Sequence, residues 1–206
     1  TQDISTQEKT NIRIVQPNIP QADKMSGNLN GEILASLMRL SSVSSKQQGF
    51  VPDVIIWPES ATNFLLYDDD VIMNYIMNNI PLGILLISGT IRIEEEENQK
   101  AYNSMIFVRK DEKRRLQKAI YDKRILVPFG EYIPLVGNLP FIESIAGGSI
   151  GFKKGKDLRH SDYFLHRNFV FVPNICFETI FLNAIFKKND GKKTTIGWLK
   201  HQENIV

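Results

Sequence analysis

The stretch DVIIWPES, residues 53–60, decides the fold class of this chain. It is a compact, β-branched apolar run that Pro58 stops, which predicts a short buried strand. A second apolar run, GILLISG at 83–89, has the same character, and apolar residues at helical spacing occupy 71–80 between the two. Strand, helix and strand in this order, with wholly apolar strands, predict an α/β fold in which helices cover the sheet.

The same patterns continue on both sides of this stretch. Residues 12–15 form an apolar run that a turn closes, and residues 28–45 show helical spacing. A polar hairpin turn at 94–100 precedes runs that favour antiparallel pairing. The further expected strands are therefore 12–15, 102–108, 117–121 and 169–172, and the further expected helices are 28–45 and 179–187.

Composition excludes several classes of protein. The chain has 206 residues, 42% hydrophobic and 23% charged, which is typical of a globular domain. Its net charge of +2 is too near balance to favour a nucleic-acid partner. One cysteine excludes an intramolecular disulfide and a four-cysteine zinc site, and we expect neither a cofactor nor a metal. No apolar run approaches the roughly 18 residues of a membrane span.

Residues 124–156 are interrupted by many prolines and glycines, and such a long irregular segment is often functional. Two interpretations of its large apolar residues stay open: they are ordinary core, or they form a membrane-facing lid. These residues are Phe129, Tyr132, Ile133, Leu135, Val136, Leu139, Phe141 and Ile142.

The single cysteine, Cys176, falls where the strand at 169–172 passes into a helix. A lone cysteine is most often a small buried hydrophobe. At a helix N-terminus, however, backbone N–H groups stabilise a thiolate and a developing oxyanion. The position is therefore suitable for a nucleophile.

A nucleophilic thiol needs a base and a cation. The three histidines, His160, His166 and His201, lie in polar surroundings, and we expect them at the surface. Glu59 and Lys123 each follow an expected strand, and strand ends are where sites of α/β proteins assemble. The alternatives are that Glu59 only complements a helix dipole and that Lys123 is a solvated surface lysine.

Three motifs in order, Trp57-Pro58-Glu59-Ser60, Tyr121-Asp122-Lys123 before LVPFGE, and NICFE around Cys176, resemble the Glu-Lys-Cys triad of the nitrilase superfamily. Together with VQPNIPQ at 15–21, YNS at 102–104 and LVPFGEYIP at 126–134, they resemble the extracytoplasmic domain of bacterial apolipoprotein N-acyltransferases. The resemblance runs over 12–186, which leaves a linker at 1–11 and a divergent polar tail at 187–206.

The resemblance implies an acyl transfer in two steps. Cys176 would take a fatty acyl chain from a phospholipid as a thioester and pass it to the N-terminal amino group of a diacylglyceryl apolipoprotein. Glu59 would be the general base and Lys123 would stabilise the oxyanion. Glu131 would orient Lys123 or the base, and Glu178 would support the pocket. The family places such a domain at the bacterial inner membrane, on the periplasmic side.

The resemblance also implies a nitrilase-like αββα sandwich. We expect it to be incomplete at the C-terminus, because residues 187–194 replace the family's further strands with a polar, lysine-rich run. Activity of such a truncated chain is an open question. One alternative is a soluble nitrilase-like amidase that hydrolyses a small carbon–nitrogen substrate with the same triad. Another is a degenerate fragment that keeps the fold without turnover.

Overall fold

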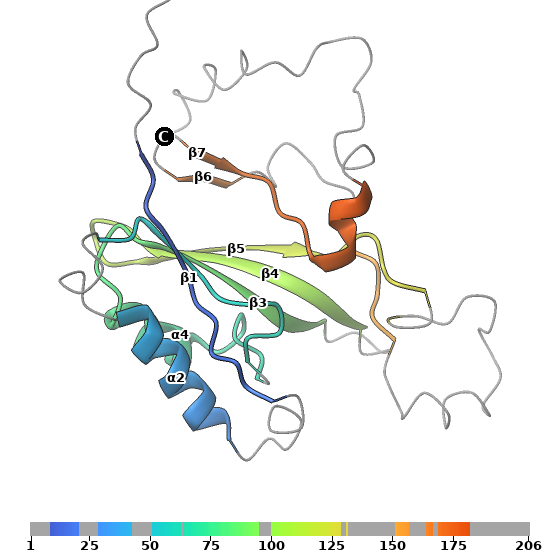
Figure 1. The fold of residues 1–206 in the computed structure, drawn as a ribbon, viewed down its shortest axis with the longest axis horizontal. Helices are drawn as coiled ribbons and strands as arrows, with labels where there is room; N and C mark the ends of the chain where they lie inside the picture. Colours follow the sequence, from blue (N-terminus) through green and yellow to red (C-terminus); the bar gives the residue numbers. More distant parts are fainter. Residues whose placement is uncertain are drawn as a thin grey trace, which may run out of the picture.

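The computed structural model describes residues 9–20, 29–42, 51–62, 64–94, 100–128, 131, 151–156, 164–166 and 169–181. Their elements form a mixed sheet, two helices, a small hairpin and a short 3₁₀ helix (Figure 1). In chain order they are β1 (Ile12–Ile14), α2 (Asn30–Ser42), β2 (Val54–Ile56), α4 (Asp70–Asn78), β3 (Leu85–Glu94), β4 (Lys100–Lys110), β5 (Leu116–Asp122), β6 (Phe164–His166), β7 (Phe169–Phe171) and η2 (Cys176–Phe181).

The main sheet has the order β1-β2-β3-β4-β5. The first three strands are parallel, with Val54 opposite both Ile12 and Leu85. β3, β4 and β5 are antiparallel, so the β4–β5 hairpin extends the parallel half. Parallel strands need crossover connections, and α2 and α4 lie in the chain where these connections are required.

Both helices pack on one face of this sheet (Figure 1). Leu37 of α2 and Ile76 of α4 are fully buried in one cluster with sheet residues such as Leu86 and Ile106. The indole Nε1–H of Trp57 donates a 2.8 Å hydrogen bond to Ser41 Oγ, which joins the end of β2 to α2. Residues 53–57 of the DVIIWPES stretch are thus largely buried between strands and a helix, whereas Glu59 and Ser60 at its end are exposed.

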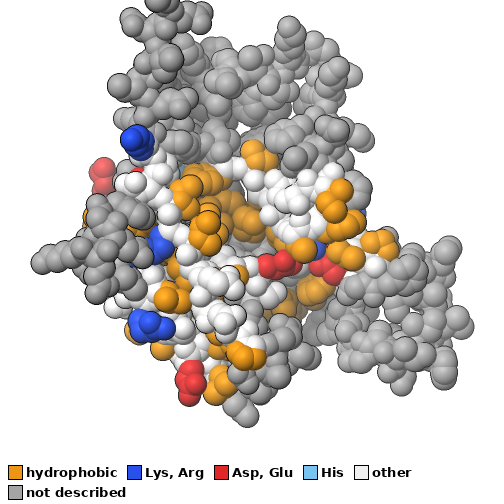
Figure 2. All heavy atoms as spheres, in the orientation of Figure 1, with side chains coloured by type: hydrophobic (Ala, Val, Ile, Leu, Met, Phe, Trp, Pro, Cys, Tyr) orange, Lys and Arg blue, Asp and Glu red, His pale blue; other side chains and the backbone are white. Residues whose placement is uncertain are grey.

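The opposite face of the sheet packs against the C-terminal segment. Because side chains alternate along a strand, Val54 and Phe107 point away from the helices. They form a second buried cluster with Ile175, and Phe171 packs against it. Figure 2 shows hydrophobic side chains gathered between the sheet and the segment that carries β7 and η2. This segment brings Cys176 to the sheet.

The structure confirms the α/β class and most of the expected elements. Runs of 102–108 and 117–121 are antiparallel strands as predicted, and the expected strand at 169–172 is β7. β6 is a strand that the sequence patterns did not predict. The helix expected from 179 instead begins at Cys176 as the 3₁₀ helix η2, within the residues that the structure describes.

Several predictions concern segments outside the described residues. The eight apolar residues of the expected lid or core, the polar tail at 187–206, His160 and His201 all belong to such segments. Across the described ranges, neither helix has the length and apolar character needed to cross a bilayer.

The helix α4 supplies a test of the fold. Asp69 is its N-cap, and the carboxylate accepts a 2.9 Å hydrogen bond from the Ile72 amide. We expect Asp69→Ala to lower the free energy of unfolding by about 1 kcal/mol, measured by urea denaturation. The neighbouring exposed Asp68 offers a matched control, since Asp68→Ala removes the same charge without the cap. Equal losses in the two variants would contradict the capping role.

Candidate active site

Glu59 lies just beyond the end of β2, in a turn that continues beside β3. The amide of Trp57 donates to the carbonyl of Ile87 at 2.8 Å, so the chain still follows β3 after β2 has ended. The side chain of Glu59 is exposed, and its Oε1 accepts a 2.8 Å hydrogen bond from Asn103 Nδ2 on β4. This carboxylate is therefore accessible to solvent and oriented by the neighbouring strand.

Lys123 directly follows β5. Its amide donates to the carbonyl of Asn103 at 2.8 Å, which extends the pairing of β4 with β5. Its side chain is only 1% exposed, and Nζ lies 2.8 Å from Glu131 Oε1. The alternative of a solvated surface lysine is wrong, because this ammonium group is buried and paired with a carboxylate.

Glu131 receives hydrogen bonds on both carboxylate oxygens. Oε1 accepts from Lys123 Nζ at 2.8 Å and from Asn103 Nδ2 at 3.1 Å, and Oε2 accepts from the Val127 amide at 2.9 Å. Burial raises the pKa of Glu131, but the bonds from Lys123, Val127 and Asn103 outweigh it, so the pKa lies below its ordinary value of 4.5. Glu131 is therefore an anion at neutral pH.

Asn103 connects the two carboxylates, and the sequence patterns gave it no role. Its Nδ2 donates to both Glu59 and Glu131, while its backbone carbonyl accepts from the Lys123 amide. The side chain is buried on β4, with 6% of the residue exposed. The available signal was an asparagine inside an expected strand, because a buried amide requires hydrogen-bond partners.

Cys176 is the first residue of η2, and it is exposed. The interpretation as a buried small hydrophobe is therefore wrong. Its φ angle of +51° is uncommon for a residue with a side chain, and such outliers cluster at functional sites. Within the described residues, no hydrogen bond joins the thiol to Glu59 or Lys123.

Glu178 fastens the cysteine segment to the end of β5. The side chain is fully buried, and its Oε1 accepts from the amides of Arg124 and Ile125 at 2.7 and 3.0 Å. Its Oε2 accepts from the Ile175 amide at 2.9 Å. One carboxylate therefore binds the residues that follow Lys123 and the residue that precedes Cys176.

The phenol of Tyr121 completes this arrangement. Its hydroxyl lies 2.8 and 2.9 Å from the two Glu178 oxygens. Burial raises the pKa of Tyr121, so the hydroxyl stays protonated and donates to the carboxylate. Glu178 thus has four donors around it: the Tyr121 hydroxyl on β5, two amides just after β5, and the amide just before η2.

The structure therefore joins Glu59, Lys123 and Glu131 in one hydrogen-bonded chain through Asn103. It brings the Cys176 segment to the same end of β5 through Glu178. The groups provide an accessible carboxylate, a buried ammonium ion and an exposed thiol. Such a set can move one proton, stabilise a negative oxygen and form a covalent bond to carbon.

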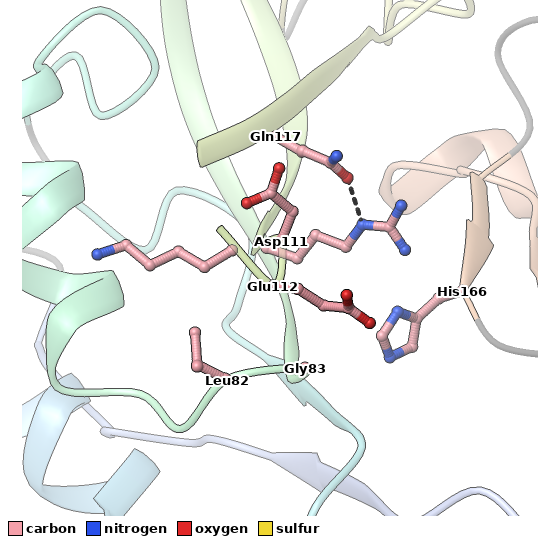
Figure 3. Close-up of a pocket in the computed structure, with 8 residues that line it drawn as sticks. Leu82, Gly83, Asp111, Glu112, Gln117 and His166 are labelled. Atoms are coloured by element: carbon pink, nitrogen blue, oxygen red, sulfur yellow. Dashed lines mark hydrogen bonds between the residues drawn. The ribbon is translucent and has the colours of Figure 1, made fainter. Parts of the chain in front are cut away.

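A separate pocket lies at the opposite end of β4 and β5 (Figure 3). Its volume is about 550 Å³, and none of the expected site residues lines it. His166 does line it and is only 4% exposed, so its expected surface position is wrong. Among the described residues, no group of three or more His, Cys, Asp or Glu side chains is placed to hold a metal ion.

Comparison with known proteins points to one family. No family model matches the chain. The apolipoprotein N-acyltransferase of Allorhizobium ampelinum is 34% identical over 194 residues, 91% of this chain and 36% of that protein. That of Sinorhizobium fredii is 32% identical and covers 87% of this chain and 34% of the relative. That of Rhodopseudomonas palustris is 30% identical, with coverage of 96% and 37%.

The chain spans about a third of the length of these relatives, and the similarity extends over nearly all of its own residues. The expected resemblance is thereby confirmed. By sequence, this chain belongs with the apolipoprotein N-acyltransferases and corresponds to one part of them.

Proposed function

We propose that this chain carries the catalytic groups of an acyltransferase that acylates lipoproteins. A fatty acyl chain moves from a phospholipid to Cys176 as a thioester, and then to the N-terminal amino group of a diacylglyceryl apolipoprotein. The observation that carries the proposal is the hydrogen-bonded chain from Glu59 to Lys123, beside the segment that holds an exposed thiol.

In the first half-reaction, Cys176 Sγ attacks the ester carbonyl carbon of the phospholipid. The thiol proton passes to the Glu59 carboxylate, and the carbonyl oxygen becomes an oxyanion that Lys123 stabilises. The tetrahedral intermediate then breaks the bond to the ester oxygen. The lysophospholipid leaves with the proton from Glu59, and the thioester remains.

The second half-reaction uses the same groups. The apolipoprotein amine attacks the thioester carbon, and Glu59 takes a proton from the nitrogen. A second oxyanion forms next to Lys123 and collapses as the carbon–sulfur bond breaks. Glu59 returns the proton to Cys176, so the product is an amide and the enzyme is restored.

The pairing of Lys123 supports its role. Glu131 bonds the Lys123 Nζ group from one side and restricts its position. A buried cation that is already oriented stabilises an oxyanion without reorganisation of the surroundings. Glu131 therefore acts on Lys123, while Glu59 has an exposed carboxylate that a substrate can reach.

We infer two further properties that follow from the family. The five-stranded sheet with its two helices forms one half of a nitrilase-like αββα sandwich, and the apolar face under η2 belongs to its interior. The protein acts at the bacterial inner membrane with this part on the periplasmic side. The relatives do not favour the amidase alternative, since they are named as N-acyltransferases.

Mass spectrometry of the chain after incubation with phospholipid vesicles tests the function. We expect an acyl thioester on Cys176. The Cys176→Ser variant should form no thioester, because it lacks the sulfur atom. Glu59→Gln should slow thioester formation by about 10²- to 10⁴-fold, because the general base is lost. Lys123→Ala should slow it to a similar extent.

Glu112→Gln is the matched control, because it neutralises an exposed carboxylate at the far end of the β4–β5 hairpin. Its rate of adduct formation should equal that of the parent chain. An adduct that forms equally fast in Glu59→Gln would contradict the mechanism. No adduct in the parent chain would favour the degenerate fragment.

Glu178 should stabilise the protein more than a surface carboxylate does. In Glu178→Gln the amide replaces a charged acceptor that four donors surround, and the amide N–H₂ then faces other N–H groups. We expect the free energy of unfolding, from urea denaturation, to fall by about 2–3 kcal/mol. A change within about 0.5 kcal/mol, as expected for exposed substitutions such as Glu112→Gln, would contradict this role.

The contribution of Glu131 to stability should depend on pH. Because its folded-state pKa lies below 4.5, the folded state binds fewer protons than the unfolded state as this group titrates. Its stabilisation is fully present above pH 4.5 and is lost as the pH falls through the folded-state value. Denaturant unfolding at several pH values should show a difference in the free energy of unfolding between the parent and Glu131→Gln. This difference should disappear in acid. An equal difference in unfolding free energy at pH 3 and pH 7 would contradict the pairing of Glu131 with Lys123.

A further inference from the structure

Gly89 of β3 lies directly against the backbone that carries Glu59. A Cβ atom added to Gly89 would lie 2.6 Å from Glu59 Cα, 2.7 Å from Ser60 N and 2.8 Å from Pro58 O. All three contacts are with backbone atoms, so no side chain can rotate away. Ordinary contact between carbon atoms needs about 3.5 Å, and any side chain at Gly89 would push the turn outward by about 1 Å.

The contact at Gly89 is part of a hydrogen-bonded turn. The Gly89 amide donates to Pro58 O at 3.2 Å, and Ser60 has a φ angle of +49°. The turn therefore lies flat on β3 instead of leaving the sheet where β2 ends. This close approach positions the Glu59 backbone so that its carboxylate accepts the hydrogen bond from Asn103 on β4.

Gly155 makes a similar close contact with Asp122, the residue that precedes Lys123. A Cβ atom there would lie 2.2 Å from Asp122 O and 2.8 Å from both Asp122 C and Cβ. The Gly155 amide donates to Lys123 O at 2.9 Å, and three residues earlier the Phe152 amide donates to Glu131 O at 3.0 Å. The segment 151–156 therefore bonds both members of the Lys123–Glu131 pair.

We propose that Gly89 and Gly155 are positioning residues, which place the Glu59 carboxylate and the Lys123 ammonium group by letting backbone approach backbone. The proposal rests on the proposed function of these two groups. A displacement of about 1 Å in a reacting group can lower a rate by about 10²-fold. Neither glycine touches a reacting atom, so each acts only through the residue it contacts.

The test compares Gly89→Ala and Gly155→Ala with Gly31→Ala, whose added Cβ on α2 would meet no atom within 4 Å. We expect the first two to slow acylation of Cys176 by phospholipid vesicles about 10²-fold, at an unchanged half-saturating lipid concentration. Gly31→Ala should match the parent. In the Glu59→Gln background, Gly89→Ala should cause no further loss, because its effect passes through Glu59.

A second measurement does not depend on activity. Asn103 Nδ2 bonds both carboxylates, so its side-chain amide resonances in NMR spectra report their positions. Gly89→Ala should shift these resonances in the direction that Glu59→Gln does, and Gly155→Ala in the direction that Glu131→Gln does. Should the parent form no adduct, the proposed function fails, and these shifts still decide the role of the glycines.

Unshifted Asn103 resonances in folded Gly89→Ala and Gly155→Ala would overturn the proposal. The proposal would also be overturned if Gly89→Ala slowed the acylation of Cys176 in the Glu59→Gln background as much as it does in the parent. If one alanine variant does not fold, the other carries the test. If neither folds where Gly31→Ala does, the glycines serve the fold, and the proposal is also overturned.

Discussion

The buried carboxylate of Glu178 is the interaction on which the arrangement of the candidate site depends. An ionised group without solvent is costly unless donors surround it, and four donors do so here. Three of them are backbone amides on either side of the gap between β5 and η2. Because the carboxylate requires all of them at once, the chain after Lys123 and the chain before Cys176 are held together.

Lys123 is a second buried group whose hydrogen-bonding partners are supplied by the surrounding chain. Its buried ammonium ion is paired with Glu131, and Asn103 and the Val127 amide bind the remaining acceptor positions of that carboxylate. A buried ion pair contributes little to stability unless such extra hydrogen bonds satisfy it. The result is a network in which two carboxylates share one amide; the Glu59 residue is exposed, whereas the Glu131 side chain is only 13% exposed.

Regular elements and strand-end residues could be predicted, because apolar periodicity and proline stops are local properties of the sequence. The class of the fold, β2, β3 and the antiparallel β4–β5 hairpin were all predicted correctly. β6 was missed, and His166 was wrongly expected at the surface, because three residues carry too little periodicity to show a buried face. The role of Asn103 could not be predicted either, since its partners lie 28 and 44 residues away.

The sequence by itself determined the order of most strands and helices and the family resemblance, and it named Glu59, Lys123, Glu131, Cys176 and Glu178 as candidate site residues. Only the tertiary structure decided that Lys123 is buried, that Cys176 is exposed at a positive φ angle, and that Asn103 joins two carboxylates. It also decided why β3 has a glycine beside Glu59. The physical reason is that burial, hydrogen-bond partners and backbone approach depend on residues far apart in the chain, whereas propensity and motif do not.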